Sequence, residues 1–209
     1  MDTTDAADLV AEVHEAGQDE NTHFRNRAAL MIAVLAAVLA IDGLGGGNAT
    51  DDMIGENIHA SDTWAFYQAK NMRQTLYELA VDDIETRLAA PGLDPAARAG
   101  LDSRLARYRA TVARYESEPD PEAPSDPLRG EGLAQLRARA QAHVAAREVA
   151  ASRDDNFDFA EVFLQLALVL GSIAILAINR PILWLAGGLG LIGTLLTANG
   201  FLLLFPLPF

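Results

Sequence analysis

The stretch FAEVFLQLALVLGSIAILAI, residues 159–178, decides the fold class of this chain. It is 20 residues long and Glu161 is its one charged residue. That length matches a helix that crosses the hydrocarbon core of a bilayer. Because Glu161 lies within the first turn, its carboxylate can reach the polar interface. The stretch therefore predicts a membrane-spanning helix.

Two more segments have the same character. AALMIAVLAAVLAIDGL, residues 28–44, follows Arg27 and has no charge before Asp42, which predicts a span over residues 25–44 near the short end of the usual length. After residue 178, Pro181 disfavours helical geometry at the residue before it and predicts a tight turn. A third span is expected over residues 182–205.

Composition excludes several classes of protein. The 209 residues include 29 Asp and Glu against 16 Lys and Arg, a net charge of -13, so binding of nucleic acid through phosphate neutralisation is not expected. Since the chain has no cysteine, a disulfide scaffold and a cysteine nucleophile are excluded. No alternation typical of a strand occurs, and the predicted fold is all-α.

The N-terminal segment, residues 1–24, is acidic and is predicted to be solvated and mobile. A secretory signal needs a cationic start and a cleavage site of small residues. Gly47, Asn48 and Ala49 resemble such a site, but the preceding segment has no Lys or Arg before Arg25. An uncleaved anchor is therefore expected. The acids are Asp2, Asp5, Asp8, Glu12, Glu15, Asp19 and Glu20.

Residues 45–158 separate the first two spans and predict an extramembrane helical domain. The glycines at 45–47 predict a flexible joint, and Ser61 is a natural N-cap for a helix that ends at Pro91-Gly92. Its apolar side chains recur at helical spacing and predict one buried stripe. That stripe consists of Trp64, Ala65, Ala69, Met72, Leu76, Leu79 and Ile84.

A second helix is expected from Asp94-Pro95, an N-cap acid before a proline at the first helical position. Its apolar positions alternate fours and threes, the period of a coiled-coil seam. They are Ala97, Leu101, Leu105, Tyr108, Val112 and Tyr115. The stretch EPDPEAPSDP, residues 118–127, has four prolines and predicts a loop.

A third helix begins near Glu131, with Leu133, Leu136, Ala140 and Val144 on one side. Two alternatives remain: it continues to Ile178, or the acidic patch at residues 154–158 breaks it and caps a new helix. The expected domain is a helical hairpin or coiled coil. Because its stripes are narrow and rich in alanine, association into a homo-oligomer is predicted to bury more apolar area.

Polar residues at membrane depth are the candidate functional residues: Asp42, Glu161 and Gln165. Asp42 and Glu161 either reach headgroup water or surround an axis in an oligomer and attract cations. Gln165 is expected to hydrogen-bond a neighbouring helix. Small residues four apart predict close helix packing. These are Ala167, Gly171, Ala186, Gly190 and Thr194.

Trp64, Phe66 and Tyr67 are candidate interaction aromatics, either packed against another helix or in contact with a partner or lipid. The four histidines, at 14, 23, 59 and 143, lie in different segments without the spacing of a zinc site. No nucleophile elbow or phosphate loop occurs. No metal, no cofactor and no enzymatic activity are expected.

Basic residues suggest an orientation. Arg25 and Arg27 precede the first span and Arg180 lies in the turn between the last two, whereas Arg147 and Arg153 flank the other side. The positive-inside rule then places the N-terminus in the cytoplasm. Residues 45–158 and the C-terminus are expected outside it.

Three segments together resemble a known family: SDTWAFYQAKNMRQTLYELA (61–80), RNRAALMIAVLAAVLAI (25–41) and NFDFAEVFLQLALVLGSIAIL (156–176). In this order and spacing they are similar to the bacterial family called domain of unknown function 4337. The resemblance implies a bacterial membrane protein with three spans, expected in the cytoplasmic membrane. It implies no activity and assigns no functional residue.

Two functions fit these features. The favoured one is a non-enzymatic membrane protein that acts by self-association or by docking a protein partner. The alternative is an oligomeric ion channel or transport accessory that uses Asp42 and Glu161.

Overall fold

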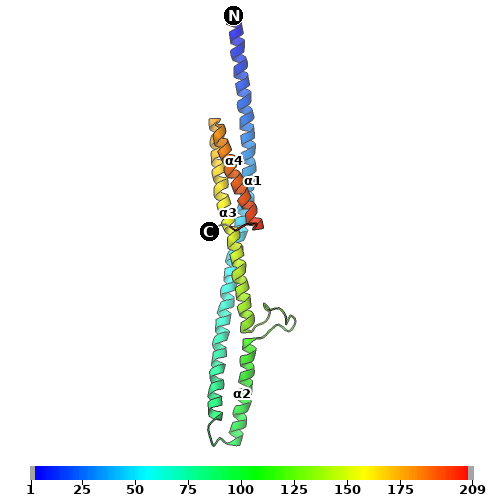
Figure 1. Cartoon of the computed structure of the whole chain (residues 1–209), viewed down its shortest axis with the longest axis vertical. Coiled ribbons are helices and arrows are strands. Elements are labelled where there is room, and N and C mark those ends of the chain that lie inside the picture. Colours follow the sequence, from blue (N-terminus) through cyan, green and yellow to red (C-terminus); the bar gives the residue numbers. More distant parts are fainter. Residues whose placement is uncertain (1–2, 207–209) are drawn as a thin grey trace. The chain divides into compact units, whose positions relative to one another are not determined.

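The computed structural model describes the backbone of residues 3–206 and the side chains of residues 21–206. Within that range the fold is all-helical, as predicted, with four helices: α1 (Thr3–Leu88), α2 (Pro95–Glu116), α3 (Leu133–Ala177) and α4 (Arg180–Leu202) (Figure 1). Three of them, α1, α3 and α4, are long and apolar enough to cross a membrane by length and composition. This finding fits a membrane protein.

The chain divides into two compact units. Unit 1 consists of Met1–Asp51 with Val149–Phe209, and unit 2 consists of Asp52–Glu148. Unit 1 therefore holds the beginning of α1, the second part of α3 and all of α4, whereas unit 2 holds the rest of α1, α2 and the beginning of α3.

Helix α1 has no interruption between Thr3 and Leu88, so the joint predicted at residues 45–47 and the helix start predicted at Ser61 are both wrong. The glycines allow close packing. A Cβ atom on Gly45 would lie 2.6 Å from the Phe157 ring, and one on Gly46 would lie 3.3 Å from the Phe157 Cβ. The backbone stays helical because the absence of side chains lets the Phe157 ring approach it.

The acidic segment 1–24 belongs to α1 from Thr3 onward. Met1 and Asp2 lie outside the described residues, and the predicted mobility of this segment stays a prediction.

Helix α3 is continuous from Leu133 to Ala177, which decides between the two alternatives left by the acidic patch. Asp154 does not cap a helix; its carboxylate accepts a hydrogen bond from the Thr50 hydroxyl at 2.6 Å. The predicted start of α2 is confirmed, since the Asp94 side chain caps the amides of Ala96 and Ala97.

Helix α4 starts at Arg180, slightly before the predicted span. Asn179 is its N-cap, and the side chain of Asn179 accepts from the Ile182 amide. Its C-cap is Leu203, whose backbone is left-handed with φ 46°. The chain is no longer helical beyond this cap. The predicted span, which ended at residue 205, is therefore too long at its C-terminal end.

The interior of unit 1 is built from small residues against branched ones. Leu35, Leu164 and Ala167 form a buried cluster. A Cβ on Gly190 would lie 2.6 Å from Leu35, and one on Gly171 would lie 2.9 Å from Ile32. Of the residues expected to support close packing, four are buried and Thr194 is half-buried; the four are Ala167, Gly171, Ala186 and Gly190.

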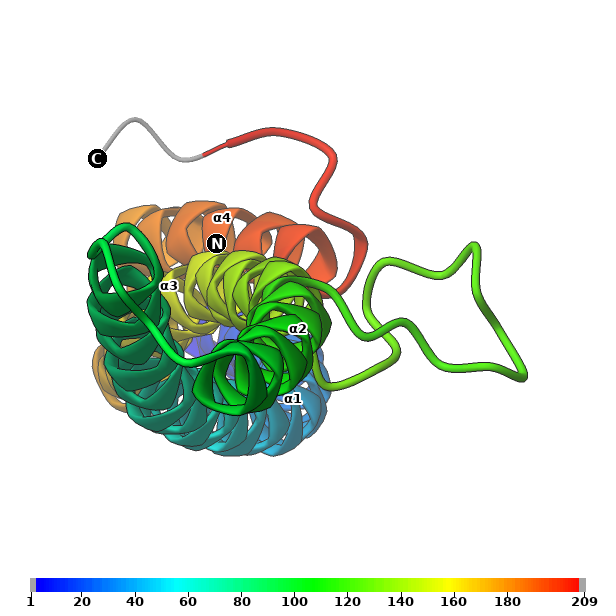
Figure 2. The ribbon, with the colours of Figure 1, turned by 90° about the horizontal axis from the view of Figure 1, so that it is seen from below.

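Unit 2 packs α1 against α2 and α3. Tyr77 on α1 meets the rings of Tyr108 and Tyr115 on α2 edge to face, at centroid distances of 5.3 and 5.9 Å. On α3, Leu136 and Ala140 are buried. The loop between α2 and α3 stands away from the helices of this unit (Figure 2).

The stripe predicted for α1 is confirmed only in part, because Ile84 is buried and Trp64 is half-buried but the stripe residues between them are exposed. Met72, Leu76 and Leu79 are 69%, 62% and 60% exposed, whereas Lys70 and Gln74 are buried. The buried side of α1 in unit 2 is therefore more polar than the sequence suggested, and a row of apolar side chains is left outside.

Candidate functional site

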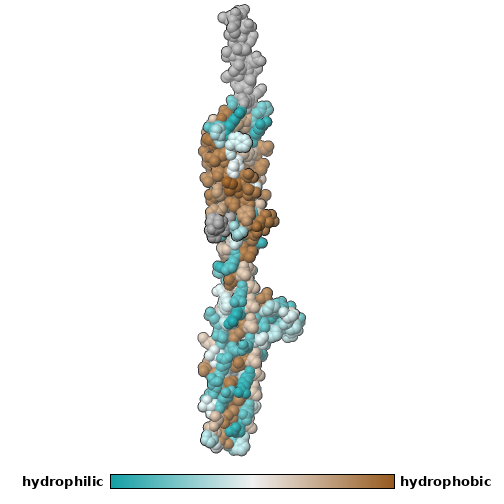
Figure 3. Space-filling view, viewed as in Figure 1, coloured by the Kyte–Doolittle hydropathy of each residue, from teal (hydrophilic) through white to brown (hydrophobic). Residues whose placement is uncertain are grey.

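Unit 1 has an apolar outer surface. Figure 3 shows hydrophobic colouring over this surface, whereas the surface of unit 2 is mixed and largely hydrophilic. The exposed apolar side chains come from all three helices of unit 1, among them Leu30 and Val34 on α1, Val169 on α3 and Leu195 on α4. A water-soluble bundle would place such side chains inside, so this surface is suited to an apolar solvent.

Polar side chains instead occupy the interior of unit 1. Asp42 on α1 is 1% exposed, and its carboxylate accepts a hydrogen bond from the Thr197 hydroxyl of α4 at 2.7 Å. Thr197 also lies 3.1 Å from the Gly193 carbonyl in its own helix. Because a buried carboxylate needs a donor, this bond ties α1 to α4.

A second polar contact ties α3 to α4. The Asn199 amide donates to the Asn156 side-chain oxygen at 2.7 Å, and both residues are buried. Asn199 also donates to the Phe205 carbonyl and accepts from the Phe205 amide, at 2.9 and 3.1 Å. We call Asp42, Asn156, Thr197 and Asn199 the polar layer.

Aromatic packing adjoins the polar layer. The Phe157 ring meets the Phe201 ring edge to face at 4.9 Å. A Cβ on Gly200 would lie 2.7 Å from Phe157, nearly as close as one on Gly45 would come. Glycines from α1 and α4 thus enclose one buried ring of α3.

The predicted polar residues divide between the interior and the surface of unit 1, and Glu161 lies close enough to Asp42 for the two carboxylates to interact electrostatically. Asp42 faces the interior, whereas Glu161 and Gln165 are exposed on α3. The Gln165 amide donates to the Glu161 carboxylate at 2.7 Å, within one helix and not to a neighbouring helix as expected. The cation pathway through Asp42 and Glu161 stays a prediction.

The second candidate site is an apolar row on α1 in unit 2, which we call the outer face. It consists of Ile58, Ala65, Ala69, Met72, Leu76 and Leu79. All six are exposed. From Ala65 to Leu79 the steps are four, three, four and three residues, the period of a coiled-coil seam.

The opposite side of α1 in unit 2 is occupied within the chain. Lys70 is 6% exposed; its ammonium donates to the Glu131 carbonyl and to Glu118 at 3.3 Å, and lies 5.3 Å from the Tyr115 ring centre. These contacts explain how a lysine is buried at this seam.

The candidate aromatics divide between the two sides. Trp64 and Tyr67 meet edge to face at 5.4 Å, and the Tyr67 hydroxyl accepts from Arg137 of α3 at 2.8 Å. Phe66 is exposed beside the outer face. Tyr67 therefore contacts α3, whereas the ring contact of Trp64 stays within α1.

One cluster in unit 2 could not be found from the sequence. The rings of His59 and His143 lie 5.4 Å apart, and His143 Nδ1 is 2.7 Å from the Glu56 carboxylate. These residues come together because α1 packs against α3. No spacing within one segment of the sequence indicates this contact. Among residues 21–206, no group of His, Cys, Asp and Glu side chains has a geometry that could hold a metal ion.

The sequence matches a known protein family. The family described as Domain of unknown function (DUF4337) matches residues 24–203. The chain belongs to this family. The match covers most of the sequence, so the resemblance drawn from the three segments is confirmed. The family's description names no activity, and it therefore carries no functional role over to these residues.

No curated protein and no solved structure matches the chain.

Proposed function

We propose that the chain is a non-enzymatic membrane protein whose unit 2 associates with a second copy through the outer face of α1. In this proposal the apolar helices of unit 1 cross the bacterial cytoplasmic membrane three times. The observation that carries the self-association is the outer face itself, an exposed apolar row with a coiled-coil period.

Bilayer insertion is supported by the inverted polarity of unit 1. Its outer side chains are apolar, whereas Asp42, Thr197, Asn156 and Asn199 are buried and hydrogen-bonded to one another in pairs. In hydrocarbon no water can satisfy polar groups, so they gather between helices. The same arrangement would be unfavourable for a bundle surrounded by water.

Self-association is supported by the period of the outer face. A lipid surface or an irregular protein surface does not require steps of three and four, whereas a second helix lying alongside does. The row from Ile58 to Leu79 extends over about 32 Å at 1.5 Å per residue. Anchoring in a membrane raises the effective concentration of copies, which favours a seam as short as this one.

Charge at the edges of the outer face favours a parallel pair of identical helices. With Met72 and Leu79 at d positions, Asp82 takes a g position and Arg87 the following e position. A parallel copy therefore brings Asp82 beside Arg87 of the second copy. No like charges meet at the g and e positions of the three preceding heptads, whereas Asp62 and Asp83 lie at a positions and each face their own copy. The facing pairs there are Thr75 with Ala80, Gln68 with Arg73 and Ser61 with Phe66.

Cysteine cross-linking tests the proposal, because the natural chain has no cysteine. Met72→Cys and Leu79→Cys place a thiol on the outer face, whereas Glu78→Cys places it on an adjacent exposed position that faces away. After mild oxidation in native membranes we expect dimers from the first two variants and few from Glu78→Cys. If the Met72→Cys variant forms dimers and the Leu79→Cys variant does not, the two helices are antiparallel.

Equal yields from all three positions would mean random collision, and no dimers from any would overturn self-association. If the chain is monomeric, the outer face would bind a helix of another protein instead. That outcome corresponds to docking of a protein partner.

The orientation is part of the proposal. We place the N-terminus in the cytoplasm and unit 2 outside it, on the basis of Arg25, Arg27 and Arg180 at one end of unit 1. A thiol introduced as Ser125→Cys, in the exposed loop between α2 and α3, tests this with an impermeant maleimide. Labelling in intact cells supports the placement, and labelling that requires lysis reverses it.

A further inference from the structure

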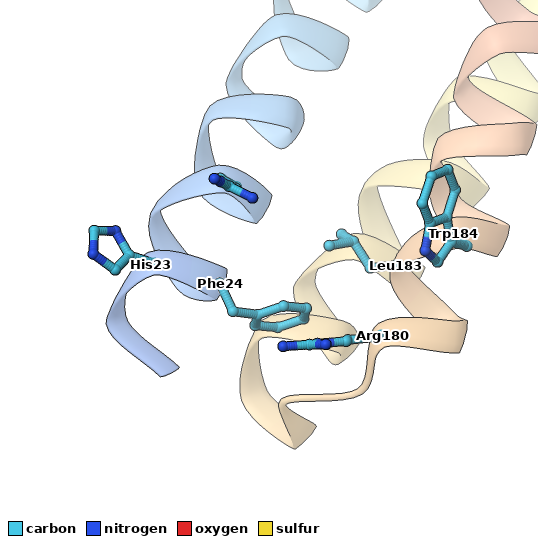
Figure 4. A pocket seen from close by; sticks show the side chains of 6 residues that line it. His23, Phe24, Arg180, Leu183 and Trp184 are labelled. Carbon is cyan, nitrogen blue, oxygen red and sulfur yellow. The ribbon is translucent and has the colours of Figure 1, made fainter. Parts of the chain in front are cut away.

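A hollow in unit 1 brings together basic side chains from both ends of the sequence. Its volume is about 720 Å³, and we call it the basic pocket. His23, Phe24 and Arg27 come from α1, and Arg180, Leu183 and Trp184 come from the first turns of α4. Figure 4 shows the Phe24 ring beside the Arg180 side chain, with Leu183 and Trp184 on the next turn.

The lining of the basic pocket has the chemistry of an amphiphilic anion site. Two guanidinium groups, Arg27 and Arg180, can bind phosphate oxygens with paired N–H donors. None of the six lining residues is an acid. Leu183 and the 83% exposed Trp184 add an apolar wall, and an indole at such a place prefers the boundary between water and hydrocarbon.

The apolar surface of unit 1 begins next to this pocket. One turn or two beyond Arg27 lie exposed Leu30 and Val34 on α1, and Leu185 and Leu191 follow Trp184 on α4. An anion held by the two arginines would therefore have its hydrocarbon part against these side chains. A free phosphate ion would use the arginines alone and gain nothing from this surface.

We propose that the basic pocket binds the phosphate headgroup of an anionic phospholipid. The inference rests on the proposed insertion of unit 1 in a bilayer, and it goes beyond self-association because it assigns a ligand to a different part of the chain. Basic pockets between spanning helices are suited to anionic headgroups since the charge is neutralised where the acyl chains meet the helices.

The test is thermal unfolding of the full chain in a zwitterionic detergent, with circular dichroism as the readout. The Tm is measured at increasing concentrations of phosphatidylglycerol. We expect phosphatidylglycerol to raise the Tm and phosphatidylcholine to have no such effect. Arg27→Gln and Arg180→Gln should each weaken the apparent affinity about tenfold, because each removes a charge-assisted contact.

Arg25→Gln is the matched control. Arg25 is exposed on the same helix, two residues from Arg27, and is not part of the lining. It should leave the titration unchanged. If Arg25→Gln weakens binding as much as Arg27→Gln, the effect is general surface charge and the site is overturned. If inorganic phosphate stabilises the chain as well as the lipid does, the lipid assignment is overturned.

A separate measurement keeps this proposal distinct from the proposed function. Retention of the chain in membranes after carbonate extraction tests insertion by itself. A chain that stays in the membrane and shows no response to phosphatidylglycerol overturns the basic pocket alone, whereas a chain released by carbonate overturns the insertion on which it rests.

Discussion

The Thr197 hydroxyl donates a hydrogen bond to the Asp42 carboxylate at 2.7 Å, and both side chains are buried in a unit whose outer surface is apolar. A carboxylate in such a place depends on its donor, because no other described side chain hydrogen-bonds to it. The bond joins two helices through residues that are 155 positions apart in the sequence. It is thus a direct link between the first and last helices of unit 1.

Replacing Thr197 by valine should destabilise unit 1. The variant keeps the shape of the side chain and leaves the buried Asp42 without its donor, which costs about 1–3 kcal/mol. The measurement is the free energy of unfolding in mixed micelles of dodecyl maltoside and dodecyl sulfate. Thr194→Val is the control, since the hydrogen bond of Thr194 stays within its own helix, to Gly190. Equal losses in both variants would contradict a structural role for the link between Thr197 and Asp42.

Alanine at Gly45 should be strongly unfavourable although alanine favours helices. Its Cβ would lie 2.6 Å from buried Phe157 and 2.8 Å from Phe201, so both rings must move, at a cost of about 1–3 kcal/mol. Gly47→Ala is the control: no atom lies within 4 Å of its added Cβ, and helix propensity predicts a gain of up to about 1 kcal/mol. Unfolding in the same micelles measures both.

A second change separates overcrowding from backbone effects. Combining Gly45→Ala with Phe157→Leu should recover part of the loss, because the smaller side chain makes room for the methyl group. Strictly additive losses would show that Phe157 is not the obstacle and that close approach of its ring is not the reason for glycine at position 45.

The helical and apolar character of unit 1 could be predicted from sequence because it depends on composition along one segment. The run at 159–178 contains its own signal, as does the helix cap at Asp94 in unit 2. The unbroken course of α1 could not be predicted in that way. Glycines at 45–47 are unfavourable in an isolated helix, and only the distant Phe157 shows why two of them, Gly45 and Gly46, are tolerated.

The buried side of α1 in unit 2 also could not be predicted from the local sequence pattern. Apolar spacing favoured Met72, Leu76 and Leu79 as core, whereas the structure buries Lys70 and Gln74. Lysine is placed there by Glu118, the Glu131 carbonyl and Tyr115, all of them on α2 or in the loop that follows it. Except for Asp42, the polar layer could not be predicted either. Asn156, Thr197 and Asn199 form it through hydrogen bonds between helices, which no local pattern indicates.

Replacing Asn199 by leucine should release the chain that follows α4. The Asn199 side chain donates to the Phe205 carbonyl and accepts from the Phe205 amide, so both bonds disappear. Hydrogen exchange at the Phe205 amide should accelerate about tenfold as this local opening becomes easier. Asn156→Leu is the control, because Asn156 bonds Asn199 but not Phe205. Equal acceleration in both variants would indicate general loosening of unit 1.

Replacing Lys70 by methionine should loosen the loop between α2 and α3 while leaving the helices of unit 2 in place. Lys70 holds both ends of this loop, at Glu118 and at Glu131, and methionine fills similar space without a donor. Loss of these contacts should lower the free energy of local opening by about 1–2 kcal/mol. Trypsin should then cleave after Arg129 about five to thirty times faster. Arg73→Met, an exposed change on the same helix, is the control and should leave the cleavage rate unchanged. An unchanged rate in Lys70→Met would mean that Arg139, which donates to the carbonyls of Leu128 and Gly130, is sufficient to hold the loop.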